Sequence, residues 1–564
     1  MTVATSVLEV PDRQTAAQRR SLPDFRDIAE TLAEEHHICS RPIPMRAVDP
    51  IAGTASYLGT PCKSTVGSVC KACADKARFL RITQCREGWH LDHEPAAGKT
   101  EPTEHQSSLL AARSDLFDTY QQAKADGDED MMSGVREVVA DLDAEMKESG
   151  FRGRLPALDR EPKARRYRST RRRQDVPNLP RLKVEKRTLG REYAGHRPSM
   201  FITLTMPSYG GIHRDGAIND KGEVVGDGSP RDPNSYDYPR AARDIVHFSA
   251  LIDRWIQNLR RAVGWNIQYF ATVEPQKRGA PHLHILIRGT VSRDILRQVT
   301  AATYHQVWWP NHDRDSEVYA GEVLPVWNPA KMTFTDPDTG SALLGFEDVQ
   351  DLLADVDGLE PAHVVRFGDQ MDRADMRGFV PGRKADRAVG YVTKYLTKSI
   401  AEVLDTDSDR TRRHYERLHQ ELQHTPCSPR CAVWLRYGIV PVGASEKTIP
   451  GRCKGKAHRR DTLGLPGRRV LVSRQWSNKT LPDHKADRAE FVRQLLASVG
   501  IVKPDTSHLR LSVVKPGDRS APPRDHPIMA SIAQRKTWRA EYNRALLAAG
   551  PPAQQETSAD LVAA

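Results

Sequence analysis

Two histidines separated by one residue are the first feature that could support chemistry. Alternate side chains of a β-strand leave the same face, so His282 and His284 would lie about 7 Å apart and could converge on one cation. Glu274 ends the preceding predicted strand, and hairpin pairing would bring its carboxylate to that face. Two histidines and one carboxylate suit a divalent ion that must also hold a phosphate oxygen. By itself, His-x-His is a weak signal, and two surface histidines explain it better.

Two tyrosines form the second constellation. Tyr391 and Tyr395 would be one turn apart on a helix, with Lys394 and Lys398 along a flank beside them. A phenol can attack phosphorus and leave a covalent phosphotyrosine. Nearby ammonium groups would stabilise the phenolate and the charge that builds on the phosphoryl oxygens. Taken alone, the spacing is also typical of tyrosines packed in a core beside solvated lysines.

The eight cysteines fall into two clusters, which in a reducing compartment favours metal binding over disulfides. In the first, Cys70-x-x-Cys73 is a zinc-type pair, and Cys62 and Cys39 would complete four thiolates. The fourth ligand of this site is left open, because three other residues compete for it. The alternative interpretation is that these are ordinary buried cysteines that bind no metal. The rival ligands are Cys85, His90 and His93.

The second cluster combines Cys427, Cys431 and Cys453 with His458, while His424 competes for the fourth place. Its surroundings are polar and basic, so a metal-tied module could hold this loop rigid against DNA. The basic neighbours are Arg452, Lys454, Lys456, Arg459 and Arg460.

These residues must be positioned by regular elements, and the best-patterned stretch runs from 196 to 402. Strands are expected at 201–205, 266–274, 282–288 and 363–367, and helices at 241–263, 292–307 and 384–402. Strand 201–205 alternates, so one face packs inward and the other could offer hydroxyls near the metal strands. The order of these elements, strand, helix, hairpin, helix and strand, predicts an α+β fold with a central antiparallel sheet flanked by helices.

Composition indicates a polyanionic partner. The chain has 564 residues with 38% hydrophobic residues, 28% charged residues and a formal net charge of +11. A basic balance of this size favours nucleic acid over an anionic membrane. No run of 18 apolar residues exists, and the N-terminus lacks the short apolar core of a secretory signal. We therefore expect no membrane partner and a cytoplasmic location.

A basic stretch between 160 and 187 is expected to contact DNA phosphates, which carries little sequence information. A solvated, disordered arm is the alternative, and such an arm can also order on DNA. The arginines expected to bind are Arg165, Arg166, Arg168, Arg171, Arg172 and Arg173.

The composition shifts divide the chain. The expected parts are a disordered N-terminus (1–35), a cysteine-rich zinc-type module (36–95), an acidic then basic linker or insertion (96–195), the patterned α+β domain (196–402), a second cysteine-containing basic module (403–480), and a helical C-terminal segment with a disordered tail (481–564).

In combination, strand 201–205, His282-Leu283-His284 and Tyr391-Val392-Thr393-Lys394-Tyr395 resemble the HUH endonuclease superfamily. Residues 274–284, 427–431, 434–438 and 467–474 resemble, more closely, the rolling-circle replication initiators of actinobacterial plasmids and integrative conjugative elements. The match covers roughly residues 36–95 and 196–480, and its motifs are specific in combination. The acidic stretch near 126–148 has no part in the family pattern.

The resemblance implies a sheet that presents a metal to the scissile phosphate. His282 and His284 would be ligands, with Glu274 a third, and the ion would be Mg²⁺ or Mn²⁺, since a hard cation suits phosphate oxygens. Tyr391 or Tyr395 would be the nucleophile, with Tyr391 favoured for the first cut. The product would be a 5′-phosphotyrosine and a free 3′ hydroxyl for a polymerase.

Other functions remain open at this point. A transposase or a conjugative relaxase would use the same nicking step. A non-catalytic DNA-binding protein held together by zinc would use the arm and the cysteine modules alone, but it leaves the coincidence of histidine strand and tyrosine helix unexplained. No Gly-x4-Gly-Lys-Ser/Thr phosphate loop occurs in the chain, so a host helicase and polymerase are expected as partners besides DNA.

Overall fold

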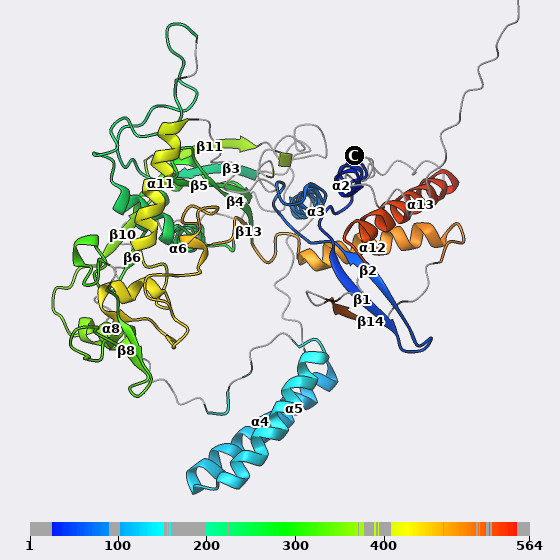
Figure 1. The fold of residues 1–564 in the computed structure, drawn as a ribbon, viewed down its shortest axis with the longest axis horizontal. Coiled ribbons are helices and arrows are strands. Elements are labelled where there is room, and N and C mark those ends of the chain that lie inside the picture. The colour runs from blue at the N-terminus through cyan, green and yellow to red at the C-terminus, as the bar shows by residue number, and fades with distance from the viewer. Residues whose placement is uncertain are drawn as a thin grey trace, which may run out of the picture. The chain divides into compact units, whose positions relative to one another are not determined.

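The computed structural model covers most of the chain (Figure 1). The described residues are 25–89, 102–151, 155, 157–159, 199–222, 225–321, 323–369, 371–376, 389, 390, 393, 408–465, 467–502, 506, 508–514, 518 and 522–549. The chain divides into two compact units, Met1–Glu94 with Asn178–Ala564, and Pro95–Pro177. Within the described ranges, no helix is both long and apolar enough to cross a membrane.

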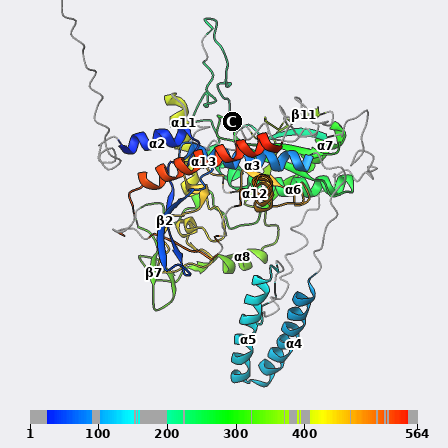
Figure 2. The ribbon, with the colours of Figure 1, turned by 90° about the vertical axis from the view of Figure 1, so that its right-hand side faces the viewer.

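The smaller unit is a pair of helices, α4 (Glu104–Asp126) and α5 (Glu129–Glu148), which lie side by side in both views (Figures 1 and 2). Gly127 ends α4 in the left-handed region, with a φ of 75°, and Asp128 caps α5 by accepting the backbone N–H of Met131. Tyr120 and Val135 are buried between the helices. The sequence predicts an acidic, weakly helical linker or insertion here, and capping signals and an apolar seam make this stretch a helical hairpin.

The larger unit contains a five-stranded sheet in the order β11-β3-β5-β4-β13 (Figure 1). Every neighbouring pair is antiparallel. The strands are β3 (Ser199–Thr205), β4 (Tyr269–Pro275), β5 (Pro281–Arg288), β11 (Met371–Met376) and β13 (Val470–Val472). The predicted mixed α+β class is confirmed, and β5, which carries both histidines, is the central strand.

One face of this sheet packs on α6 (Tyr238–Val263) and, beyond it, α7 (Arg293–Ala302). Ile202 and Leu283 point to this side because alternate residues share a face, and they meet Trp255 of α6 in the main core. Asp237 caps the start of α6 by accepting the backbone N–H of Arg240. The apolar alternation of the strands therefore sends the intervening polar residues, including both histidines, to the opposite face.

The opposite face is partly covered by α3 (Lys71–Trp89). Phe270 and Leu286 of the sheet pack there with Ile82 and Trp89 of α3 and with Trp476. The indole Nε1 of Trp89 donates a hydrogen bond to Ser199 Oγ at 3.2 Å. A helix from the N-terminal cysteine region thus packs against the same sheet face as the histidines.

The segment after β5 differs from the predicted helix 292–307. Helix α7 ends at Ala302, and residues Tyr304–Val307 form strand β6, which pairs with β10 (His363–Arg366). Thr303 adopts an extended conformation that ends the helix. The expected strand 363–367 is present, in a separate two-stranded sheet.

Both ends of the described chain fold together. Strand β1 (Ile43–Asp49) pairs with β2 (Thr54–Thr60) and with β14 (Arg510–Val513). Helix α2 (Phe25–Glu35) packs on α13 (Asp525–Ala549), and α12 (Leu481–Ala497) contacts both α3 and α13. Residues 25–35 were predicted to be disordered; they are helical because Ala29 and Ala33 are buried against Ile528. The predicted separation of 36–95 from 481–564 is also not observed.

The expected boundary at 402 differs from the structure as well. Strand β13 completes the edge of the five-stranded sheet, and α11 (Asp409–His424) inserts Leu418 and Leu422 into the main core. Long-range burial thus joins the second cysteine region to the sheet. The remaining elements of the larger unit are η2 (Arg314–Ser316), β7 (Val326–Asn328), β8 (Thr333–Thr335), β9 (Leu344–Gly345), α8 (Phe346–Ala354), η3 (Ala432–Tyr437), β12 (Ile439–Val440) and η4 (Lys456–His458).

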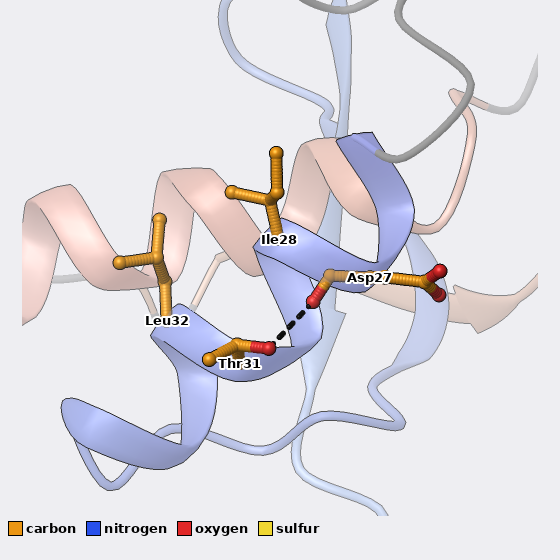
Figure 3. Close-up of a pocket in the computed structure, with 4 residues that line it drawn as sticks. All are labelled: Asp27, Ile28, Thr31 and Leu32. Carbon is orange, nitrogen blue, oxygen red and sulfur yellow. Dashed lines mark hydrogen bonds between the residues drawn. The ribbon is translucent and has the colours of Figure 1, made fainter.

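A small hollow lies beside α2 (Figure 3). Its lining residues are Asp27, Ile28, Thr31 and Leu32. Thr31 Oγ1 donates a hydrogen bond to the backbone oxygen of Asp27 at 2.9 Å, so the hydroxyl is satisfied within its own helix. None of the predicted site residues lines this hollow.

Candidate metal centres and active site

Strand pairing brings Glu274, His282 and His284 together. Glu274 lies directly opposite His282 across the β4–β5 hairpin, and His284 is two residues along on the same face. The carboxylate Oε2 of Glu274 lies 3.3 Å from His282 Nε2 and 3.6 Å from His284 Nε2. One ligand atom from each residue lies within 4.8 Å of the others, which is close enough to share one metal ion.

Neighbouring side chains orient the His284 ring. Thr203 sits opposite it on β3, and its Oγ1 lies 3.0 Å from His284 Nδ1. Phe201 stacks on the same ring at 5.6 Å between centroids, with 13° between the planes. When Nδ1 carries the proton and donates it to Thr203, Nε2 presents its lone pair to the cluster. Thr203 therefore supplies one of the hydroxyls expected from this strand.

The electrostatics of this trio fit a cation. Burial acts to raise the pKa of Glu274, but the contacts of its carboxylate with His282 and His284 outweigh burial and lower that pKa. Burial also lowers the pKa of His282, which favours the neutral imidazole that a metal requires. Oε1 of Glu274 is buried and has no hydrogen-bond partner among the described residues. A buried carboxylate oxygen without a donor is suited to coordinate a hard ion.

The turn between β4 and β5 holds the trio in register. Gly279 takes a φ of 79°, and the backbone N–H of Gln276 donates to Ala280 O at 2.8 Å. The guanidinium of Arg278 donates to the backbone oxygens of Pro207 at 2.7 Å and Met206 at 2.8 Å. Sequence reasoning missed this clamp on the end of β3; the signal available was an arginine inside a tight turn.

The first cysteine cluster gathers Cys39, Cys62, Cys70 and Cys73, whose sulfur atoms lie within 4.8 Å of one another. Cys70 Sγ is 3.8 Å from Cys39 Sγ, far beyond a disulfide bond, and all four are free thiols. The rival Cys85 is fully buried in the core between α3 and the sheet. His90 and His93 lie outside the described residues.

The second cluster gathers Cys427, Cys431, Cys453 and His458 within the same limit. His458 Nε2 lies 3.3 Å from Cys431 Sγ, and the backbone N–H of Gly455 donates to Cys453 Sγ at 3.3 Å.

The rival histidine of the second cluster has another partner. His424 Nδ1 lies 2.5 Å from Glu317 Oε1. Three sulfurs with one imidazole, and four sulfurs in the first cluster, could each hold a metal ion, which fits zinc.

The predicted helix 384–402 is described at three positions, Val389, Gly390 and Thr393, which are helical. Thr393 Oγ1 donates to Val389 O at 2.6 Å, and Val389 packs in the cluster of Phe270 and Leu286. Val389 therefore packs on the sheet face that carries the histidines. Several predicted residues lie outside the described part of the chain: Tyr391, Lys394, Tyr395, Lys398, Arg165, Arg166, Arg168, Arg171, Arg172 and Arg173.

The sequence profile of the family described as "Replication initiator protein, pSAM2" matches residues 25–534. The chain belongs to this family. The family's description names replication initiation. The profile spans both cysteine clusters and the histidine strand.

A curated relative, a replication initiator protein of Streptomyces ambofaciens, is 25% identical over 273 residues, which is 42% of this chain and 52% of that protein. The match thus spans about half of the relative's length. No solved structure matches the chain.

Proposed function

We propose that this initiator is an HUH endonuclease that nicks one strand of origin DNA through a tyrosine and so starts rolling-circle replication. The observation that carries the proposal is the convergence of Glu274, His282 and His284 on the central strands of an antiparallel sheet. The packing of Val389 on that same face supports a tyrosine helix beside the trio. Membership in a replication-initiator family supports the biological role.

In this proposal, Tyr391 makes the first cut and Tyr395 allows a second transfer. The phenolic oxygen gives up its proton and forms a bond to phosphorus. The bond from phosphorus to the 3′ oxygen breaks, and that oxygen is protonated to a free 3′ hydroxyl. The result is a 5′-phosphotyrosine. Lys394 and Lys398 would stabilise the phenolate and the phosphoryl charge.

His282, His284 and Glu274 would hold the divalent ion, Mg²⁺ or Mn²⁺. When bound, it supplies Lewis-acid polarisation of a phosphoryl oxygen. Thr203 would keep the His284 ring in the orientation that presents Nε2. Zinc at the two cysteine clusters would be structural, because each ligand set is closed at four protein atoms. A host helicase and polymerase, acting in the cytoplasm, would use the exposed 3′ hydroxyl.

A nicking assay tests the proposal. The full chain is incubated with supercoiled plasmid from its own element and Mn²⁺, with and without EDTA. Tyr391→Phe, Tyr395→Phe and their double variant are compared with Tyr542→Phe, on the distant helix α13. We expect a covalent protein–DNA adduct that requires the metal, survives Tyr542→Phe and disappears in the double variant.

Other outcomes would redirect the proposal. Intact DNA in every lane, together with tight metal-independent binding, would favour a non-catalytic zinc-stabilised DNA-binding protein. Joining of element ends after nicking would indicate a transposase, and transfer of the strand between cells would indicate a relaxase.

A further inference from the structure

Helix α3 extends along the sheet face that carries the metal trio. Its Trp89 is anchored at Ser199, at the start of β3. Arg81 lies eight positions before Trp89 in the helix, a rise of about 12 Å. Thr203, the partner of His284, lies four positions after Ser199 in the strand, a rise of about 13 Å. The helix is therefore long enough to carry Arg81 from the far end of the sheet to the level of the trio.

A second arginine comes to this level from the edge strand. Val470 of β13 pairs with Thr272 of β4, and Arg469 O accepts the backbone N–H of Val273 at 2.8 Å. The pairing thus continues one residue beyond β13, toward Glu274, and Arg468 directly precedes that residue. Val470 packs in the same cluster as α3, so the edge strand brings Arg468 to the margin of the trio's face of the sheet. Its side chain is exposed.

The charge of Arg468 acts on Arg81, and neither guanidinium group has an acidic partner among the described residues. Burial, and then the nearby charge of Arg468, lower the pKa of Arg81. Arg81 donates to the neutral Gln84 Oε1 at 2.8 Å, and neither arginine forms an ion pair with any carboxylate that the structure describes. One turn earlier on α3, Arg78 has a buried Nε without a hydrogen-bond acceptor in the described chain. Like charges gathered in this way are unfavourable unless an anion joins them.

We propose that Arg81 and Arg468 bind a backbone phosphate of the DNA strand, next to the phosphate that the trio would hold. The identity of the ligand rests on the proposed nicking function. A guanidinium matches phosphate oxygens with two parallel donors, which fixes position as well as charge. The pair would thereby set which phosphate of the strand reaches the trio.

The test measures DNA binding in EDTA, so that no nicking step enters. A fluorescent single-stranded oligonucleotide from the element's origin is titrated with the full chain over a series of NaCl concentrations. The variants are Arg81→Gln, Arg468→Gln, the double variant, and Arg81→Lys, which keeps the charge. Arg297→Gln is the matched control, because Arg297 is exposed on α7, which packs on the other side of the sheet.

We expect the double variant to bind roughly tenfold more weakly, and its slope of log affinity against log salt to fall by about 0.7 to 1.4. Arg81→Lys should keep most of the slope, and Arg297→Gln should keep all of it. Unchanged affinity and slope in the exposed single variant Arg468→Gln and in the double variant would overturn the proposal. A wild-type chain that binds the oligonucleotide but forms no covalent adduct with it in Mn²⁺ would refute the nicking function. The measured contribution of Arg81 and Arg468 to DNA binding would still stand.

Discussion

His414 of α11 is hydrogen-bonded to the turn that joins β4 and β5: its Nε2 lies 3.0 Å from the backbone oxygen of Arg278. On the other side of the ring, Nδ1 lies 3.0 Å from the hydroxyl of Tyr238. A carbonyl oxygen can only accept, so Nε2 carries the proton and Nδ1 accepts from Tyr238. Neutral His414 therefore connects α6, α11 and the β4–β5 turn.

Acid should destabilise the fold through this histidine. Burial, partly offset by the Arg278 carbonyl, lowers the pKa of His414 to about 4, from an ordinary value of 6.5. Since the unfolded chain then binds the proton more readily, the free energy of unfolding should fall as the pH drops from 6.5 toward 4, by at most about 3 kcal/mol from this group. Urea unfolding across this range, for the wild type and His414→Gln, measures the difference. Equal pH slopes in the two proteins would contradict the assignment.

A side chain at Gly279 should destabilise the turn. A Cβ there would lie 2.7 Å from Leu418 Cδ2 of α11, and the φ of 79° is strained for alanine. Gly279→Ala should cost about 1–3 kcal/mol and weaken metal binding at the trio. Gly264→Ala is the control, because its φ is 77° with nothing within 4 Å, and it should cost about 1 kcal/mol without affecting the metal. Thermal unfolding measures the loss of stability, and Mn²⁺ titration measures the loss of metal affinity. Equal losses in Gly279→Ala and Gly264→Ala would rule out the clash with Leu418.

The hydroxyl of Thr203 should control metal affinity rather than stability. Thr203→Val removes the partner of His284 Nδ1, and loss of such a contact typically lowers metal affinity about 10–100-fold. Thr272 pairs with His284 from the other side, and its buried Oγ1 has no hydrogen-bond partner in the described chain. Thr272→Val should therefore leave affinity unchanged. Calorimetric titration with Mn²⁺ compares them, and a matching loss in both variants would argue against a specific role for Thr203.

Metal analysis should find two zinc ions per chain, since two closed ligand sets are present. Gly455→Ala should release one ion faster, because a Cβ there would lie 3.2 Å from Cys453 Sγ and 3.3 Å from Cys427 Sγ. Gly321→Ala, where a Cβ meets nothing within 4 Å, is the control. A chromophoric chelator follows the release. Zinc release at the wild-type rate from Gly455→Ala would show that this glycine does not constrain the site.

The local sequence pattern was sufficient to predict the elements that carry and support Glu274, His282 and His284. The alternation around His282 and the apolar spacing of α6 are periodic signals, so β5 and α6 were predictable to within a few residues of their ends. Strands β11 and β13 were missed, since a short strand has little periodicity and gains its stability from pairing with β3 and β4. Their pairing makes β5 central and buries the sheet.

By itself, the sequence determined which residue types were available as ligands: a His-x-His strand, a preceding glutamate, and two groups of cysteines with a late histidine. Tertiary structure decided which of them meet. It placed Cys39 in the first cluster and Cys85 in a core, paired His424 with Glu317, and joined the chain ends through β1 and β14. Spacing along a chain limits local geometry alone, whereas burial and strand pairing between distant segments select among ligands that local pattern leaves equivalent.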